Sequence, residues 1–287
     1  MFSSGADFVA IGQSILSSSL LSPTETLQWL KPVSHTPDLR LAVGMPWEIF
    51  RIDVPVVGYS TRPGPARVAD LYAKNGGIAG YLAQIALSPD HGFGWALFQA
   101  GQPSTDGPDR QFGQFQFINE KVTQNFVPAF EAAGAEQARH NFAGVYSAND
   151  GSNMTLTVVA GDGGLGLGVR NWTTGGRDIL KAYYGLLSGS LDFEGEPRLR
   201  LYPAGMQDDT QVGFRGVYEK PGNTTNFSDG AAPFLKICGA WASIAEPAYG
   251  NIGLDDFVFT VDREGKGTAI TARGARKTMY RQPEIRN

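Results

Sequence analysis

The sequence contains a single cysteine, Cys238, so no disulfide bond can form within the chain. Its apolar runs fall far short of the roughly 20 residues that a membrane-spanning helix needs. The first 20 residues also lack the basic segment and unbroken apolar stretch of a signal peptide. We therefore expect no contact with a membrane and, for the chain as given, a cytoplasmic location.

Neither sign of charge is in large excess, because 24 basic residues face 28 acidic ones and the net charge is −4. Basic residues are spread over both halves of the chain, so we expect no nucleic-acid partner. The three histidines are scattered and form no metal-binding motif. We expect neither a metal site nor a cofactor.

What is present indicates a folded protein large enough for two domains. The chain has 287 residues, of which 42% are hydrophobic and 18% charged. Four Asn-x-Ser/Thr sequons, at Asn153, Asn171, Asn223 and Asn226, exceed chance expectation, and we interpret them as unused motifs or as relics of a secreted ancestor.

The first 140 residues predict an antiparallel sheet flanked by helices. Apolar spacing indicates a helix over residues 4–19, and Ser22-Pro23-Thr24-Glu25 is the start of a second. Strands are expected at 46–52, 68–74, 80–87 and 93–100, with a break at 75–77 between the second and third. Residues 114–140 have helical periodicity, and Pro128 should kink or divide that helix.

Beyond residue 141 the pattern changes to short β-rich runs separated by Gly, Asp and Asn. Eight to ten strands at this spacing predict an all-β barrel or sandwich. The sequence is therefore assigned to the α+β class, with one domain at 1–140 and a β-barrel domain at 141–287. The expected strands lie at 142–146, 154–160, 165–170, 180–187, 191–193, 198–203, 211–219, 236–241, 256–262 and 268–271.

The segment Lys74-Asn75-Gly76-Gly77 carries the most chemistry in the sequence. An ammonium at a strand end, an amide beside it and glycines that let a ligand approach the backbone would make an oxyanion pocket. Taken alone, the same four residues also fit an ordinary strand exit. The aromatic residues Trp47 and Tyr81 could line such a pocket, although aromatics on strands more often belong to a core.

The residues around this segment resemble the end of the transpeptidase domain of β-lactamase-related serine hydrolases, especially the large fungal ones. Residues 74–77 look like the third active-site motif of that family, with Asn75 replacing the usual hydroxyl residue. Gly80-Tyr81 and the run Pro89-Asp90-His91-Gly92 match the hairpin that follows it. The β-rich remainder resembles the family's barrel-like, lipocalin-like C-terminal domain.

The resemblance implies a role for each residue of the segment. Lys74 and the amide of Gly77 would serve catalysis by balancing charge and stabilising an oxyanion. Asn75 and Gly76 would contact the substrate, and we add Tyr81 and Trp47 to the predicted substrate-binding residues.

The motifs that supply the family's nucleophile are missing from these residues. None of the eight lysines has a serine three residues before it, so there is no S-x-x-K, and the one Y-x-N, at Tyr249, comes after the lysine segment instead of before it. We therefore predict a truncated hydrolase or transacylase relative from fungal secondary metabolism that forms no acyl-enzyme alone.

Two alternatives to a hydrolase stay open. One is a non-hydrolytic cyclase or isomerase of a biosynthetic pathway, and the other is a pseudoenzyme that binds a small molecule or acts as a scaffold. Because the absent region would leave apolar surface uncovered, we also expect a homodimer or a partner protein.

Overall fold

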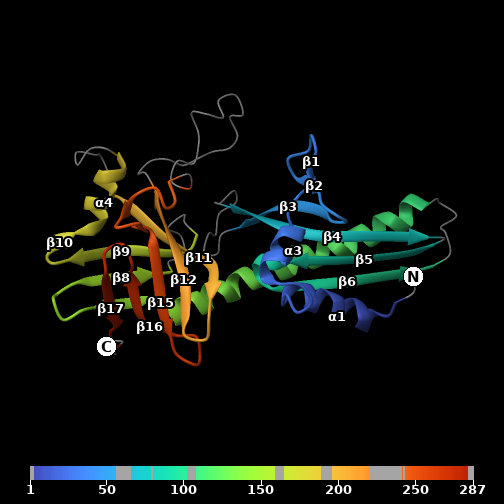
Figure 1. The fold of residues 1–287 in the computed structure, drawn as a ribbon. Coiled ribbons are helices and arrows are strands. Elements are labelled where there is room, and N and C mark those ends of the chain that lie inside the picture. The colour runs from blue at the N-terminus through green and yellow to red at the C-terminus, as the bar shows by residue number, and fades with distance from the viewer. Residues whose placement is uncertain are drawn as a thin grey trace. The chain divides into compact units, whose positions relative to one another are not determined.

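The computed structural model describes residues 3–55, 66–78, 80–101, 108–158, 165–188, 196–219, 241 and 243–283. The chain folds into two compact units, Met1–Gly134 and Ala135–Asn287, and belongs to the α+β class (Figure 1). Among the described residues, no helix combines the length and apolarity needed to cross a bilayer.

The first unit begins with two short helices, α1 (Gly5–Leu16) and α2 (Pro23–Trp29). Both start with a capping box, in which the serine before the helix and an acidic residue three positions later bond each other's backbone N–H. The capping serine of α2 is Ser22 and its partner is Glu25, as the sequence predicts.

A six-stranded antiparallel sheet follows, in the order β1-β2-β3-β4-β5-β6. Each strand pairs with its neighbour in sequence, so the sheet is a simple meander. The strands are β1 (Ser34–His35), β2 (Leu41–Val43), β3 (Glu48–Pro55), β4 (Ala66–Ile78), β5 (Tyr81–Ser88) and β6 (Phe93–Ala100), with the 3₁₀ turn η1 (Pro89–His91) before β6.

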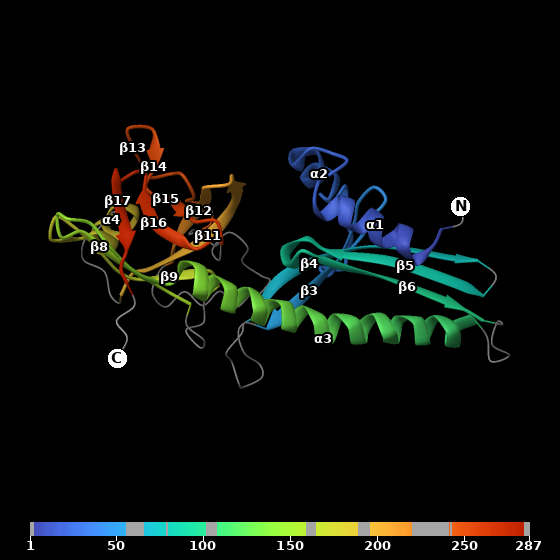
Figure 2. The same ribbon diagram turned by 90° about the horizontal axis from the view of Figure 1, so that it is seen from below.

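Helices cover both faces of this sheet. Helix α1 packs on β5 and β6, and α3 (Pro108–Phe142) runs along the opposite face (Figure 2). The core on the α1 face consists of Ile15, Leu30, Ala42, Trp47, Ile49, Ile85 and Leu87. On the α3 face, Val127 packs against Val54 and Ala69.

Helix α3 passes through Pro128 as one helix, so the predicted division is wrong, and the alternative of a kink stays a prediction. A proline removes one backbone hydrogen bond and favours a break. Val127, the residue before the proline, is 2% exposed and packs on the sheet. Glu131, one turn after the proline, accepts a hydrogen bond from Arg67 of β4. Contacts on both sides of the proline therefore hold the helix together.

The second unit contains a closed antiparallel barrel of eight strands, as predicted. The strand order is β9-β11-β12-β15-β16-β17-β7-β8, and pairing between β8 and β9 closes the ring. The barrel strands are β7 (Gly144–Ser147), β8 (Asn153–Thr157), β9 (Leu167–Thr174), β11 (Arg198–Gln207), β12 (Gln211–Glu219), β15 (Asp256–Val261), β16 (Gly267–Ala272) and β17 (Lys277–Arg281). The short strands β10 (Arg177–Asp178), β13 (Ala248–Tyr249) and β14 (Ile252–Gly253) lie outside the ring.

Large side chains fill the barrel. Trp172, Tyr146, Phe257 and Phe259 are completely buried, and Met154, Leu156, Leu201, Ile270 and Met279 are buried with them. The last turn of α3 contributes Phe142, whose ring meets those of Phe214 and Phe259 at 5.3 and 4.8 Å. The interior is thus a packed core.

One predicted strand of this unit is wrong. Residues 180–187 form most of helix α4 (Ile179–Ser188). The Asp178 carboxylate accepts a hydrogen bond from the backbone N–H of Lys181 at 3.1 Å, which is a helix-start contact. Leu180 and Tyr184 are both buried at helical spacing, and Tyr183 packs on Trp172. The expected strand at 191–193, residues 236–240 of the expected strand at 236–241, and Cys238 lie outside the described residues.

Candidate functional site

The predicted break at residues 75–77 is wrong, because β4 continues through it. Asn75, Gly76 and Gly77 pair with Gln84, Ala83 and Leu82 of β5, so the ladder is unbroken as far as Ile78. Glycine lowers strand propensity but accepts an extended backbone when a neighbouring strand supplies the hydrogen bonds. The Lys74 segment is therefore part of a rigid strand instead of a loop.

The last five residues of β4 form a free edge on one side. Strand β3 begins at Glu48, which pairs with Ala73, so residues 74–78 extend past it. They still pair with β5 on the other side. In the described part of the chain, no strand covers this edge, and its backbone groups can accept an extended ligand.

Glu48 holds the two polar side chains of this edge. Lys74 and Asn75 alternate to opposite faces of the sheet. The Glu48 carboxylate nevertheless reaches both, since Lys74 Nζ donates to Oε1 at 2.7 Å and Asn75 Nδ2 donates to Oε2 at 2.6 Å. Lys74 Nζ also donates to the carbonyl oxygen of Asn75 at 3.0 Å. The ammonium is therefore fixed in place, with 45% of its side chain exposed.

The two glycines differ in the space around them. A Cβ added to Gly76 would meet nothing within 4 Å, whereas one added to Gly77 would lie 3.0 Å from Leu82 Cδ2. Gly76 therefore faces open space, where a ligand can approach the strand. The roles predicted for Gly76 as a contact and for the Gly77 amide as an oxyanion donor stay predictions.

The two predicted aromatic residues differ in their exposure. Trp47 is 4% exposed in the core, with ring contacts to Trp29 at 5.2 Å and Tyr72 at 6.3 Å. It anchors the start of β3 and thereby positions Glu48. Tyr81 is 62% exposed at the start of β5, opposite Ile78. Their direct contact with substrate stays a prediction.

A second polar cluster, which sequence reasoning missed, lies within the same unit. Ser88 Oγ is 2.6 Å from His91 Nδ1, and His91 Nε2 is 2.8 Å from Glu131 Oε1. This is the order of groups in an acyl-transfer triad. The Ser88 residue is 0% exposed, however, so no substrate carbonyl can reach its oxygen. The cluster cannot act as a nucleophile in this conformation.

Arg67 completes the cluster and makes it an ionic lock. Its guanidinium donates to Glu131 Oε1 from Nε at 2.7 Å, contacts the same oxygen through Nη2, and donates to Asp90 from Nη1 at 2.7 Å. Burial lowers the pKa of Arg67, but the bonds to Glu131 and Asp90 outweigh burial and raise the pKa. The lock joins β4, η1 and α3 through charged bonds.

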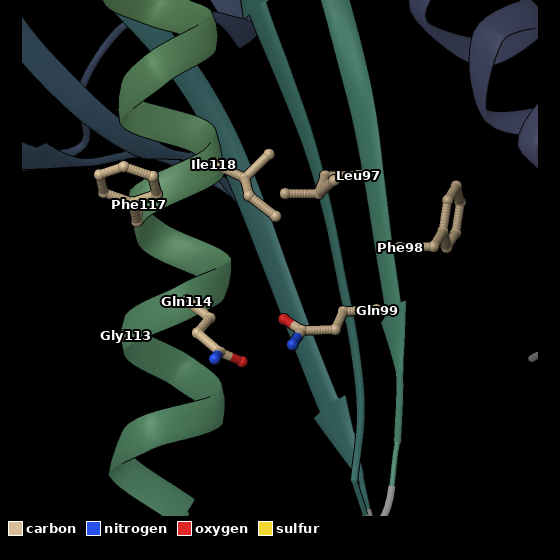
Figure 3. Close-up of a pocket in the computed structure, with 7 residues that line it drawn as sticks. All are labelled: Leu97, Phe98, Gln99, Gly113, Gln114, Phe117 and Ile118. Atoms are coloured by element: carbon tan, nitrogen blue, oxygen red, sulfur yellow. The ribbon is translucent and has the colours of Figure 1, made fainter.

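Two further features limit what the described residues can do. No group of three or more His, Cys, Asp or Glu among them is placed to hold a metal ion. A groove of about 590 Å³ lies between β6 and α3, lined without charge by Leu97, Phe98, Gln99, Gly113, Gln114, Phe117 and Ile118 (Figure 3). Its lining shares no residue with the Lys74 segment.

Comparison with known proteins identifies the barrel unit. The family described as "Beta-lactamase-like-like, C-terminal domain" matches residues 134–283, just over half of the chain. The chain belongs to this β-lactamase-like family. The match coincides with the β-rich region and leaves the Lys74 segment outside it, so the family is shown by the barrel.

Curated relatives extend the similarity to nearly the whole chain. A β-lactamase-like protein of Arthroderma benhamiae is 28% identical over 92% of this chain and 45% of its own length. A probable hydrolase of a Phoma species is 27% identical over 48% of this chain and 21% of its own length. The β-lactamase-like chain described here thus spans less than half the length of the relatives that it matches.

Among solved structures, an octameric penicillin-binding protein homologue from Pyrococcus abyssi is similar over 71% of this chain and 40% of its own. The identity is 13% and the TM-score is 0.24, which is too low to relate the two folds.

Proposed function

We propose that the free edge of β4 is one wall of a binding site for small acyl compounds, esters or amides, in a β-lactamase-like hydrolase. The attacking hydroxyl of that hydrolase lies outside these 287 residues. The observation that carries the proposal is the fixed ammonium of Lys74 beside an unpaired strand edge, at residues 74–78. The name of the Phoma relative, a probable hydrolase, supports it.

In this proposal the backbone of β4, the Lys74 side chain and the attacking hydroxyl have separate roles. The backbone groups of residues 74–78 that point away from β5 hydrogen-bond the amide or ester of the ligand, as an added strand would. Lys74 supplies positive potential, which favours the oxyanion that develops when an acyl carbon is attacked. Nucleophilic attack itself requires a hydroxyl from another segment or another chain, because these residues contain no S-x-x-K.

A second candidate is ligand binding without turnover. It is favoured by the burial of Ser88, the serine that contacts His91. In that case the β4 edge would retain an acyl compound unchanged. The cyclase or isomerase role and the link to fungal secondary metabolism stay predictions from the sequence.

The proposal is tested by mapping where a neutral ester binds. We expect the methyl ester of phenylacetylglycine to shift the backbone amide resonances of Lys74 to Ile78 in a titration followed by NMR. Gly76→Phe should weaken these shifts, because its ring fills the open space over the face of β4 next to the free edge. Gly134→Phe, at an exposed glycine of α3 whose added Cβ would also meet nothing within 4 Å, is the matched control. Shifts confined to other residues, or no shifts, would refute the proposed site.

A further inference from the structure

Glu48 already occupies one of the positions from which a carboxylate can bond the ammonium of Lys74. Both of its oxygens are engaged, one with the ammonium of Lys74 and the other with the amide of Asn75, at 2.7 and 2.6 Å. The Lys74 ammonium has a further bond to the carbonyl oxygen of Asn75 at 3.0 Å. Two of its three protons are therefore already donated within the chain.

The position of Glu48 follows from the sheet and from its neighbour. Its backbone pairs with Ala73, one residue before Lys74, in the β3–β4 ladder. Trp47, which precedes it, is buried among Trp29 and Tyr72. The start of β3 is thus anchored in the core, and only 29% of the Glu48 side chain is exposed. Moving the carboxylate away would break both of its hydrogen bonds.

The local charge is balanced without a ligand. Lys74 and Glu48 make one ion pair, and on the same two strands Arg51 Nε lies 3.2 Å from Asp70 Oδ1. A ligand carboxylate at Lys74 would place two anions beside one cation, and like charges at that distance disfavour each other. A neutral carbonyl meets no such repulsion and can accept the remaining ammonium proton.

From this balance we infer that Glu48 makes the site selective for uncharged acyl compounds and against ligands that carry a carboxylate beside the acyl group. The inference rests on the proposed function of the β4 edge and adds a substrate class and a specificity-determining residue to it. The Glu48 carboxylate takes the place at Lys74 that a substrate carboxylate would otherwise occupy.

The experiment compares two probes that differ in one charge, phenylacetylglycine and its methyl ester. Binding is measured from the amide shifts of Lys74 to Ile78 in wild-type protein. We expect the ester to bind about fivefold more tightly than the acid, which is the upper range for a partly exposed charge contact. Glu48→Gln should strengthen binding of the acid by a similar factor, because it frees the ammonium and keeps the shape.

Two further variants identify the cause. Glu120→Gln changes an exposed residue of α3 that accepts a hydrogen bond from Gln124, and it should leave the ratio of the two affinities unchanged. Adding Lys74→Met to Glu48→Gln should remove the gain for the acid, because the freed cation is gone. A gain that persists in the double variant would overturn the inference.

The outcomes separate this inference from the proposed function. Equal binding of acid and ester to wild-type protein, or a ratio unaltered by Glu48→Gln, overturns the selectivity and leaves the site standing. If neither probe shifts the amides of Lys74 to Ile78 in any variant, both the site and its selectivity are refuted.

Discussion

Glu131 accepts hydrogen bonds from both Arg67 and His91, and its side chain is only 14% exposed. Removing its charge leaves a largely buried guanidinium with Asp90 as its remaining carboxylate. We predict that Glu131→Gln lowers the free energy of unfolding by about 3 kcal/mol, the range for a broken buried ion pair. Urea denaturation at pH 7 measures the change.

The exposed Glu120 of the same helix serves as the control. Glu120→Gln should cost less than about 0.5 kcal/mol, as exposed positions usually do. Equal costs for the two substitutions would show that the Arg67 lock does not stabilise this unit.

The protonation of Asp150 makes the stability of the barrel unit depend on pH at acidic values. The hydrogen bond from Lys277 Nζ, at 2.6 Å, is the main cause that lowers the pKa of Asp150 from 3.8 to about 2, and Ser152 adds to it. Because the pKa is lower in the folded state, the stabilisation is complete above about pH 4 and is lost as the pH falls towards 2.

Asp150→Asn should therefore lower stability at pH 7, and the difference from wild type should shrink between pH 4 and pH 2. Denaturation midpoints at pH 7, 4 and 2.5 measure it. A difference that stays constant over this range would contradict the assignment.

The candidate site was only partly predictable from the sequence. Lys74, Asn75 and the two glycines are contiguous, so their chemistry is visible in the sequence itself. Glu48 lies 26 residues from Lys74, and only the register of β3 against β4 brings them together. The Ser88 cluster is more dispersed still, since Glu131 lies 64 residues from Arg67. Side-chain contacts across such separations depend on tertiary packing.

At the scale of elements, β5 and β6 approach each other closely at Gly94. A Cβ there would lie 2.6 Å from Leu87 Cδ2 and 2.7 Å from the carbonyl oxygen of Ala86. We predict that Gly94→Ala destabilises the first unit by about 1–3 kcal/mol through overpacking. Gly76→Ala, which would meet nothing within 4 Å, should change the thermal midpoint little. Similar midpoints for both variants would contradict the tight packing of β5 and β6.

Strands with clear turn signals were predictable, and elements decided by packing were not. The predicted bounds 93–100 and 211–219 are those of β6 and β12. Helix α4 was mistaken for a strand because its apolar run is short. A short apolar run fits the spacing of a helix and the alternation of a strand equally well. Strand β17, Lys277–Arg281, was missed because Met279 is its one fully buried side chain and its other residues are polar or partly exposed.

At the scale of the whole molecule, the barrel closes on itself and has its own core. We predict that a fragment of residues 135–287 folds alone and unfolds cooperatively in urea, followed by circular dichroism. Phe142→Ala in that fragment should lower stability by about 2 kcal/mol, because the ring packs on Phe214 and Phe259. A fragment without a cooperative transition would show that the barrel depends on the rest of the chain.

Self-association also belongs to this scale and stays a prediction. Light scattering at micromolar concentration tests it, and a mass equal to one chain would contradict it.

We propose that this β-lactamase-like chain has a lysine-bearing strand edge and, among the residues that the structure describes, no serine able to attack beside it. Incubation with a fluorophosphonate, followed by intact-mass measurement, tests this most directly, with an active serine hydrolase as positive control. We predict no stoichiometric mass increase, because Ser88 is buried and S-x-x-K is missing. Rapid labelling of one serine per chain would contradict the account, and its loss in Ser88→Ala would identify that serine as the nucleophile.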